Sequence, residues 1–251
     1  MNGILLKGKP IQLTVLDYGL FKVHSGPRTI GICGFAIQTD AQELVLIDTG
    51  FPPKYVANAA AASQEDGLGS FGCVLTLTND HTPLAQLAKI GRAASDVSLM
   101  IQSHTHIDHL GHMDRFPGVP ILIARAERAL PRPLYWSGKQ AMDWPLAQNH
   151  LIDHDMQLGP GFQVLLCPGH APGQLAFLLH LPNTGWVLLT SDAISRPAEI
   201  DEGFAGSWNV PLAIHHGARL MALAHEKNAL IIYGHSPQQW VGLRKAPDHF
   251  T

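Results

Sequence analysis

Six consecutive residues, His104-Thr105-His106-Ile107-Asp108-His109, concentrate three imidazoles and one carboxylate in a short segment. Neutral imidazole and carboxylate are the side chains that bind borderline divalent metals such as zinc. The segment comes directly after residues 97–101, whose continuous apolar run is typical of a short buried strand. Because ligands on a loop at the end of a strand can converge on one point, this spacing predicts a metal site.

Three further polar residues follow other strand-like runs. His170 comes after residues 162–166, Asp192 after residues 186–189 and His235 after residues 229–233. A lone histidine after a strand is usually an ordinary polar residue, but three such groups beside the first segment favour one shared site. The candidate metal ligands are therefore His104, His106, Asp108, His109, His170, Asp192 and His235.

The order H-x-H-x-D-H, then H, D and H, resembles the metallo-β-lactamase superfamily across nearly the full length, and the turn at residues 46–50 is similar to its early D-T-G element. The resemblance implies an α/β fold, the αββα four-layer sandwich. It also implies two divalent metal ions, expected to be Zn²⁺. One ion would take His104, His106 and His170, the second Asp108, His109 and His235, with Asp192 bridging. Asp48 would orient ligands without touching a metal, or simply cap its strand.

The pattern of elements agrees with this architecture. The pair Thr82-Pro83 provides a helix N-cap followed by proline, and predicts a helix over residues 84–90 that Gly91 ends. Strand meanders alternating with helices predict two sheets packed face to face with helices outside, in one domain over residues 1–251. Further strands are expected at residues 11–18, 32–38, 44–47 and 119–124, from Phe162, Leu175 and Trp186, and at 229–233, and helices at 54–62, up to 130, and 212–225.

Residues 131–150 interrupt this alternation with three prolines and the aromatic residues Tyr135, Trp136 and Trp144. Connections of this length without regular structure are uncommon unless they are functional. Two interpretations stay open. The segment is an ordinary surface crossover, or it is an active-site flap whose three aromatic side chains contact an apolar part of the substrate.

Composition and charge restrict the possible partners. With 251 residues, 46% hydrophobic and 15% charged, the chain has the composition of a folded globular protein. A formal net charge of −3 without a lysine or arginine run argues against a nucleic-acid partner. The three cysteines form no C-x-x-C pair, residues 1–10 lack the features of a signal peptide, and no apolar run approaches the roughly 20 residues of a membrane span. We expect a cytoplasmic protein without a membrane partner, and the oligomeric state stays open.

Two zinc-like ions close together would supply hydroxide at neutral pH and polarise a carbonyl group. Asp108 could then pass a proton to the leaving group as the catalytic residue. This chemistry hydrolyses esters, thioesters, lactams or lactones without a serine or cysteine nucleophile. Within the superfamily, the complete histidine and aspartate set most resembles that of the N-acyl homoserine lactone lactonases. A small-molecule lactone, opened in quorum quenching by attack of a metal-bridging hydroxide, is the expected substrate.

The chain departs from those lactonases at several positions. A tyrosine usually lies shortly after their bridging aspartate, whereas residues 192–196 contain none. Ser195 is one candidate replacement donor, and His112, which stands where glycine is common, is another candidate substrate contact. A different small lactone such as pyridoxolactone therefore stays open.

Other activities also stay open. A thioesterase of the glyoxalase II type would need a cationic patch, for which only Arg244 and Lys245 are candidates. From other classes, the alternatives are an iron-dependent oxygenase acting on persulfides and a metal-stabilised binding protein without turnover.

Overall fold

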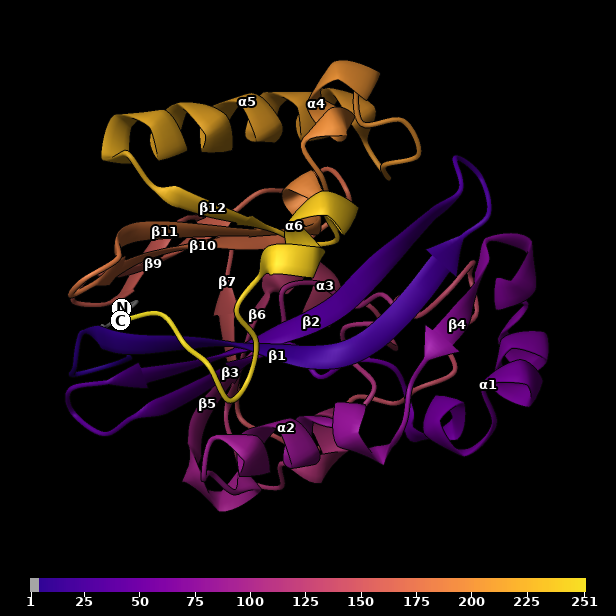
Figure 1. The fold of residues 1–251 in the computed structure, drawn as a ribbon, viewed down its shortest axis with the longest axis horizontal. Helices are drawn as coiled ribbons and strands as arrows, with labels where there is room; N and C mark the ends of the chain where they lie inside the picture. Colours follow the sequence, from indigo (N-terminus) through magenta and orange to yellow (C-terminus); the bar gives the residue numbers. More distant parts are fainter. Residues whose placement is uncertain (1–4) are drawn as a thin grey trace.

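Two β-sheets lie face to face in a computed structural model that describes residues 5–251 (Figure 1). The first four residues of the N-terminal segment, where no signal peptide was expected, lie outside the described part. The seven-stranded sheet has the order β4-β1-β2-β3-β5-β6-β7 and the five-stranded sheet the order β12-β11-β10-β9-β8. The strands are β1 (Pro10–Val23), β2 (Arg28–Thr39), β3 (Leu44–Ile47), β4 (Gly72–Thr76), β5 (Val97–Ile101), β6 (Ile121–Ala124), β7 (Asn149–Ile152), β8 (Met156–Gly159), β9 (Phe162–Leu166), β10 (Leu175–Leu181), β11 (Gly185–Ser191) and β12 (Leu230–Tyr233). The helices are α1 (Pro53–Asp66), α2 (Pro83–Lys89), α3 (Arg125–Arg128), α4 (Ala198–Glu202), α5 (Val210–Lys227) and α6 (Pro237–Gly242).

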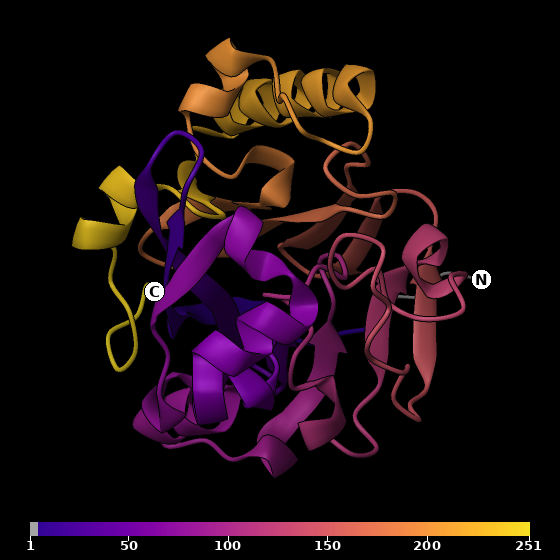
Figure 2. The same ribbon diagram turned by 90° about the vertical axis from the view of Figure 1, so that its right-hand side faces the viewer.

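Helices cover the outer surface of each sheet. Helices α4 and α5 lie over the five-stranded sheet, and α1 and α2 lie on the opposite side of the molecule, against the seven-stranded sheet (Figure 1). The view from the side keeps the same order, with the long helix α5 at the top (Figure 2). The predicted αββα four-layer sandwich is confirmed. Within residues 5–251, no helix combines the length and apolar character needed to cross a membrane.

Three apolar clusters fill the spaces between these layers. One lies between the sheets, where residues such as Ile37 and Val45 meet Phe177 and Leu179. The other two join each sheet to its own helices, with Tyr55 on the α1 side and Leu220 on the α5 side. This burial on both faces explains the nearly continuous apolar sequence of β10, which lies between β9 and β11.

The helix signals read from the sequence agree with the observed ends. The Thr82 side chain accepts a hydrogen bond from the Ala85 N–H at the start of α2, with Pro83 at the first position. Helix α5 begins after Asn209, whose side chain accepts from the Leu212 N–H, and ends at Asn228 in the left-handed conformation. The predicted strands at residues 97–101 and 162–166 match β5 and β9.

The sequence patterns missed five short elements and misjudged some ends. Strands β4, β7 and β8 and helices α4 and α6 have four to six residues each, too few to display a clear period. Strand β1 runs to Val23, past the expected end at residue 18, through a register irregularity between Asp17 and Leu20. Gly19 permits this course because its φ is +103°, and a Cβ there would lie 2.1 Å from the Thr76 carbonyl oxygen. Helix α1 likewise continues to Asp66 across a non-helical Asn58.

Candidate metal centre

The seven predicted ligands lie on four loops that meet at one edge of the sandwich. One loop follows β5 of the seven-stranded sheet, and the other three follow β9, β11 and β12 of the five-stranded sheet. Strand β12 is parallel to β11, and β9 and β11 are both antiparallel to β10, so the carboxyl ends of all three lie at the same edge. The topology therefore brings together residues that are up to 131 positions apart, from His104 to His235.

The ligand atoms form three overlapping groups, each within 4.8 Å. We call these residues the seven-residue cluster. Nδ1 of His106 lies 2.9 Å from Nε2 of His170 and 3.1 Å from Nε2 of His104. The three groups are His104, His106 and His170; His104, His109 and Asp192; and Asp108, His109 and His235.

Asp192 lies between the two ends of the cluster. Its Oδ2 is 3.5 Å from Nε2 of His170, and its Oδ1 is 3.2 Å from Nε2 of His235. The same Oδ1 lies 3.6 Å from Nε2 of His109. One carboxylate thus faces histidines on both sides, which is the arrangement that a bridging ligand requires.

The cluster contains buried polar atoms without a protein partner. Nε2 of His109 and Oδ1 of Asp192 are buried and accept or donate no hydrogen bond within residues 5–251. An unpaired buried polar atom is costly. Once His109 is neutral, with its remaining proton on Nδ1 beside Asp48, its Nε2 and Oδ1 of Asp192 would both direct a lone pair toward the other ligands, so the donor set and its geometry are consistent with a dinuclear metal site.

Burial and charge divide the histidines into two kinds. Burial, reinforced by neighbouring imidazoles, lowers the pKa of His106 to about 3 and that of His104 well below its usual value. Burial also lowers the pKa of His109 and His235, but the carboxylates of Asp108 and Asp192 outweigh it and raise these pKa values to about 10 and about 9. In the metal-free site, His104 and His106 are therefore neutral and ready to bind metal, whereas His109 and His235 hold protons that a metal must displace.

Buried partners behind the cluster fix the orientation of its histidines. Asp48 Oδ2 lies 2.8 Å from Nδ1 of His109 and accepts from the Ser103 hydroxyl at 2.6 Å. Nδ1 of His235 lies 2.9 Å from the Gly31 carbonyl oxygen. Asp48 therefore orients a histidine of the cluster, the first of the two roles expected for it.

Glu127 ties two of the four loops together and was not singled out from the sequence. This fully buried carboxylate accepts hydrogen bonds from the Thr105 N–H at 3.1 Å and the Gly173 N–H at 3.0 Å, and it also contacts the Thr105 hydroxyl. Thr105 lies between two cluster histidines, and Gly173 follows the loop of His170. No local pattern marks Glu127, since it lies in the four-residue helix α3.

A cavity of about 220 Å³ opens over the cluster, and we call it the cluster pocket. Its floor includes His106, Asp108, His170, Asp192 and His235. The rest of its lining combines apolar side chains with polar and charged ones. The apolar lining is Val23, Ile30, Phe71, Trp136 and Phe204, and the polar lining includes Arg28, Ser195, Arg196 and Glu199.

The predicted substrate contacts separate into two sets. Trp136 and Ser195 line the cluster pocket. The structure does not bring Tyr135, Trp144 or His112 into it: Tyr135 is buried and its hydroxyl donates to Asp66 at 2.7 Å, and the Trp144 Nε1–H donates to the Leu130 carbonyl. His112 is also buried, and burial lowers its pKa to about 4.

The sequence profile of the metallo-β-lactamase superfamily matches residues 35–235, which include all seven cluster residues. The chain belongs to the metallo-β-lactamase superfamily. Among its relatives in this superfamily is an N-acyl homoserine lactonase of Bacillus cereus, 29% identical over 252 residues that cover 99% of this chain and 92% of that protein. The N-acyl homoserine lactonase AttM of Agrobacterium fabrum is 29% identical over 190 residues, 70% of this chain and 72% of that protein.

Solved structures of the superfamily agree with this fold. An N-acyl homoserine lactone hydrolase with the product N-hexanoyl-L-homoserine at its catalytic metal centre superposes with a TM-score of 0.83, 24% identity, and coverage of 98% of this chain and all of that one. AidC, a dizinc quorum-quenching lactonase, gives a TM-score of 0.66 at 18% identity, covering 98% and 97% of the two chains. This chain is thus a metallo-β-lactamase-type hydrolase related to the N-acyl homoserine lactonases.

Proposed function

We propose that this protein is a dinuclear zinc lactonase that opens the ring of an N-acyl homoserine lactone. The observation that carries the proposal is the seven-residue cluster, in which Asp192 faces both histidine groups beneath a pocket lined in part by apolar side chains. The two lactonases named above, which match 99% and 70% of this chain, support the substrate class.

In this proposal His104, His106 and His170 would hold one ion, and Asp108, His109 and His235 would hold the second, with Asp192 as a ligand that both could share. Two such ions would supply hydroxide at neutral pH and polarise a substrate carbonyl. The low pKa of His106 keeps this imidazole neutral as a ligand throughout the neutral range. Asp48 and the Gly31 carbonyl hold the rings of His109 and His235 in place.

Two residues of the cluster pocket act on the substrate itself. The half-buried Asp108 lines the pocket beside His109 and His235, where it can carry a proton to the leaving oxygen of the opened ring. Ser195 lines the same pocket, and its hydroxyl has no hydrogen-bond partner within residues 5–251. This hydroxyl is therefore free to donate to the oxyanion, as a substitute for the tyrosine that the sequence lacks.

The apolar residues of the cluster pocket provide a surface on which the acyl chain of the substrate can bind. Phe71 and Trp136 pack against each other with ring centroids 5.0 Å apart, and Phe71 also stacks on Phe21 at 5.9 Å. Val23 and Ile30 continue this surface from the hairpin of β1 and β2. A chain lying against these residues leaves its carbonyl end directed toward the cluster.

The test is a hydrolysis panel with the metal content measured on the same preparation. The panel contains N-hexanoyl homoserine lactone, a γ-lactone without an acyl group, a glutathione thioester and a cephalosporin. We expect ring opening of the acylated lactone with the highest kcat/KM, by protein holding about two zinc ions per chain. Fully metallated protein that cleaves only the thioester would assign it to the glyoxalase II type instead, and fully metallated protein that cleaves none of the four compounds would reject the lactonase proposal.

A further inference from the structure

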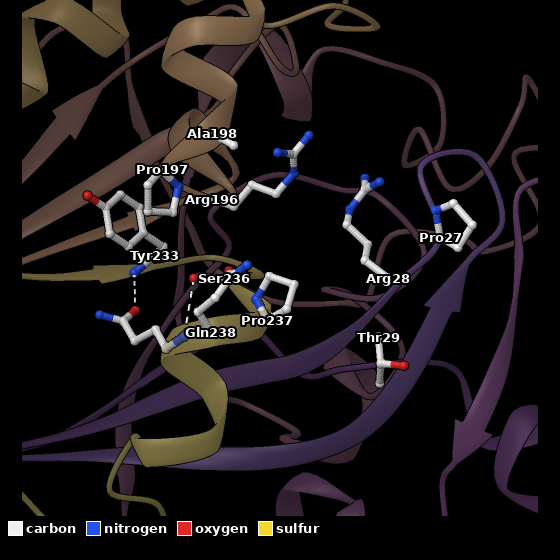
Figure 3. Close-up of a pocket in the computed structure, with 11 residues that line it drawn as sticks. Pro27, Arg28, Thr29, Arg196, Pro197, Ala198, Tyr233, Ser236, Pro237 and Gln238 are labelled. Atoms are coloured by element: carbon white, nitrogen blue, oxygen red, sulfur yellow. Dashed lines mark hydrogen bonds between the residues drawn. The ribbon is translucent and has the colours of Figure 1, made fainter.

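Two arginines meet at the rim of the cluster pocket. Arg28 begins β2, and Arg196 lies in the loop that follows Asp192. Both line the cluster pocket, and both also line a neighbouring cavity of about 690 Å³, which we call the arginine groove. Figure 3 shows the two side chains extending into the same space between α4 and the β1–β2 hairpin. The two cavities therefore share their cationic wall.

Carboxylates neutralise these guanidinium groups only in part. Both terminal nitrogens of Arg196 contact Glu202, but its Nε is buried and has no hydrogen-bond partner within residues 5–251. Nη1 of Arg28 donates to the carbonyls of Ser25 and Gly26 at 3.0 and 3.1 Å. Within the described part of the chain, no carboxylate lies within ion-pair distance of Arg28, so its Nε and Nη2 are available to a ligand.

The arginine groove itself is lined without a negative charge. None of its lining residues is acidic; the lining includes Pro27, Pro197 and Pro237, with the hydroxyls of Thr29 and Ser236. The nearest acidic groups belong to α4, where Glu199 accepts the Ser195 N–H at 2.7 Å and Glu202 pairs with Arg196. Two adjacent cations repel each other, and an anion between them relieves this repulsion.

The arginine groove also adjoins the cluster pocket beside the cluster residue His235. His235 lines the cluster pocket, and the next residue, Ser236, lines the arginine groove. A molecule with its reacting carbonyl at the cluster can therefore extend past Ser195 and place its far end at the two arginines.

We propose that Arg28 and Arg196 bind a carboxylate at the end of the substrate remote from the ring, so that the preferred substrate is an anionic acyl lactone. This inference rests on the proposed lactonase function and narrows its substrate class. Arg28 is the specificity-determining residue, because its guanidinium group, unlike that of Arg196, has no carboxylate partner.

The test compares two lactones that differ only at the chain end, N-pentanoyl and N-glutaryl homoserine lactone. The terminal methyl of the first is a carboxylate in the second. We expect the zinc-loaded protein to favour the glutaryl lactone by about tenfold in kcat/KM, mainly through KM, as one or two charge-assisted hydrogen bonds at a half-exposed site would produce. In Arg28→Gln the ratio of the two kcat/KM values should fall to about one, and Arg28→Lys should keep a ratio above that of Arg28→Gln.

Arg92→Gln is the matched control, because Arg92 is also half-buried, has no ion pair within residues 5–251 and lines a different cavity. It should keep the wild-type ratio. Equal kcat/KM for both lactones in wild type, or a glutaryl preference that survives in Arg28→Gln, overturns the anion site and leaves the lactonase function standing.

If neither lactone is opened, the proposed function has failed, and equilibrium binding decides the anion site separately. Calorimetry should then find that ring-opened N-glutaryl homoserine binds wild type about tenfold more tightly than Arg28→Gln. Ring-opened N-pentanoyl homoserine should bind wild type and Arg28→Gln with the same affinity. The same affinity of N-glutaryl homoserine for both proteins would overturn the site.

Discussion

Asp48 and Glu127 illustrate how single buried carboxylates determine the geometry of a metal centre that they do not enter. Asp48 accepts from the N–H and hydroxyl of Ser103 at 2.8 and 2.6 Å while it holds His109, and Glu127 connects residues 22 and 46 positions away. The potential ligands could be predicted from the sequence because each follows a strand. These supporting contacts could not, since they depend on which loops become neighbours after folding.

Asp48→Asn should weaken metal binding about 10–100-fold, the usual effect of losing a carboxylate behind a ligating histidine. The amide keeps the shape but loses the charge that holds the His109 ring. Competition with a chelator measures the affinity. Asp17→Asn is the control, because Asp17 is a half-buried carboxylate that accepts the Gly19 N–H away from the cluster. If Asp48→Asn binds metal with wild-type affinity, Asp48 has only a structural role in its own loop.

Ser195→Ala should lower kcat for the lactone far less than Asp108→Asn does. The serine supplies at most one oxyanion donor, worth about 10²–10³ in rate. The aspartate is both a proposed ligand and the proposed proton carrier. Rates are compared at equal measured metal content, with Ser207→Ala as the control because Ser207 also lines the pocket. If Ser195→Ala costs as much as Asp108→Asn while both keep their metals, the serine does more than donate a hydrogen bond.

At the scale of elements, residues 131–148 support the loop that carries the first four ligands, through backbone hydrogen bonds. The Tyr135 N–H donates to the Thr105 carbonyl at 2.8 Å, and the Ile107 N–H donates to the Tyr135 carbonyl at 3.0 Å, so this segment pairs directly with the ligand loop. Its aromatic composition marked it as unusual in the sequence. Which aromatic side chain faces the pocket could not be predicted, because a segment without a regular period does not reveal the direction of its side chains.

Trp136→Ala should raise KM for a long-chain acyl lactone by about tenfold, since it removes half of the Phe71–Trp136 wall. Trp144→Ala is the matched control from the same segment and should leave KM unchanged, because its indole packs against Arg128 away from the pocket. Steady-state kinetics with short and long acyl chains check both. Equal effects of the two variants would mean that the segment acts as a whole and that Trp136 makes no particular contact with the chain.

Tyr135→Phe and Tyr55→Phe should each lower the free energy of unfolding by about 1–2 kcal/mol, because both hydroxyls donate to the buried Asp66 at 2.7 and 2.8 Å. Only Tyr135 is also paired with the ligand loop. We therefore expect faster metal loss to a chelator in Tyr135→Phe and not in Tyr55→Phe. Urea unfolding and chelator kinetics measure the two effects separately. Identical metal loss in both variants would limit the role of Tyr135 to stability.

At the scale of the whole molecule, the cluster lies where the two sheets meet, with one ligand loop from the seven-stranded sheet and three from the five-stranded sheet. Alternation of strands and helices was sufficient to predict the four layers. The edge strands β4, β7 and β8 escaped prediction because their pairing partners, rather than their own short sequences, hold them in place. Folding thus brings two carboxylates and five imidazoles together at one site. The negative charges of the two carboxylates must be balanced by protons on the histidines or by metal ions.

This balance predicts how stability changes with pH. In the metal-free protein, His109 and His235 bind protons more tightly when folded than when unfolded, because Asp108 and Asp192 raise their pKa values to about 10 and about 9 from the usual value of about 6.5. The stability that these protons contribute is fully present below about pH 6.5 and is lost as the pH rises through the folded values. Metal binding needs both imidazoles neutral and strengthens with pH. We therefore expect the Tm difference between zinc-loaded and metal-free protein to widen from pH 6.5 to pH 9, as measured by calorimetry.

In Asp192→Asn, which removes the main carboxylate beside His235, the Tm of the metal-free protein should depend less on pH. A Tm that stays constant over this range in the metal-free wild type would show that the two histidines are neutral before metal enters.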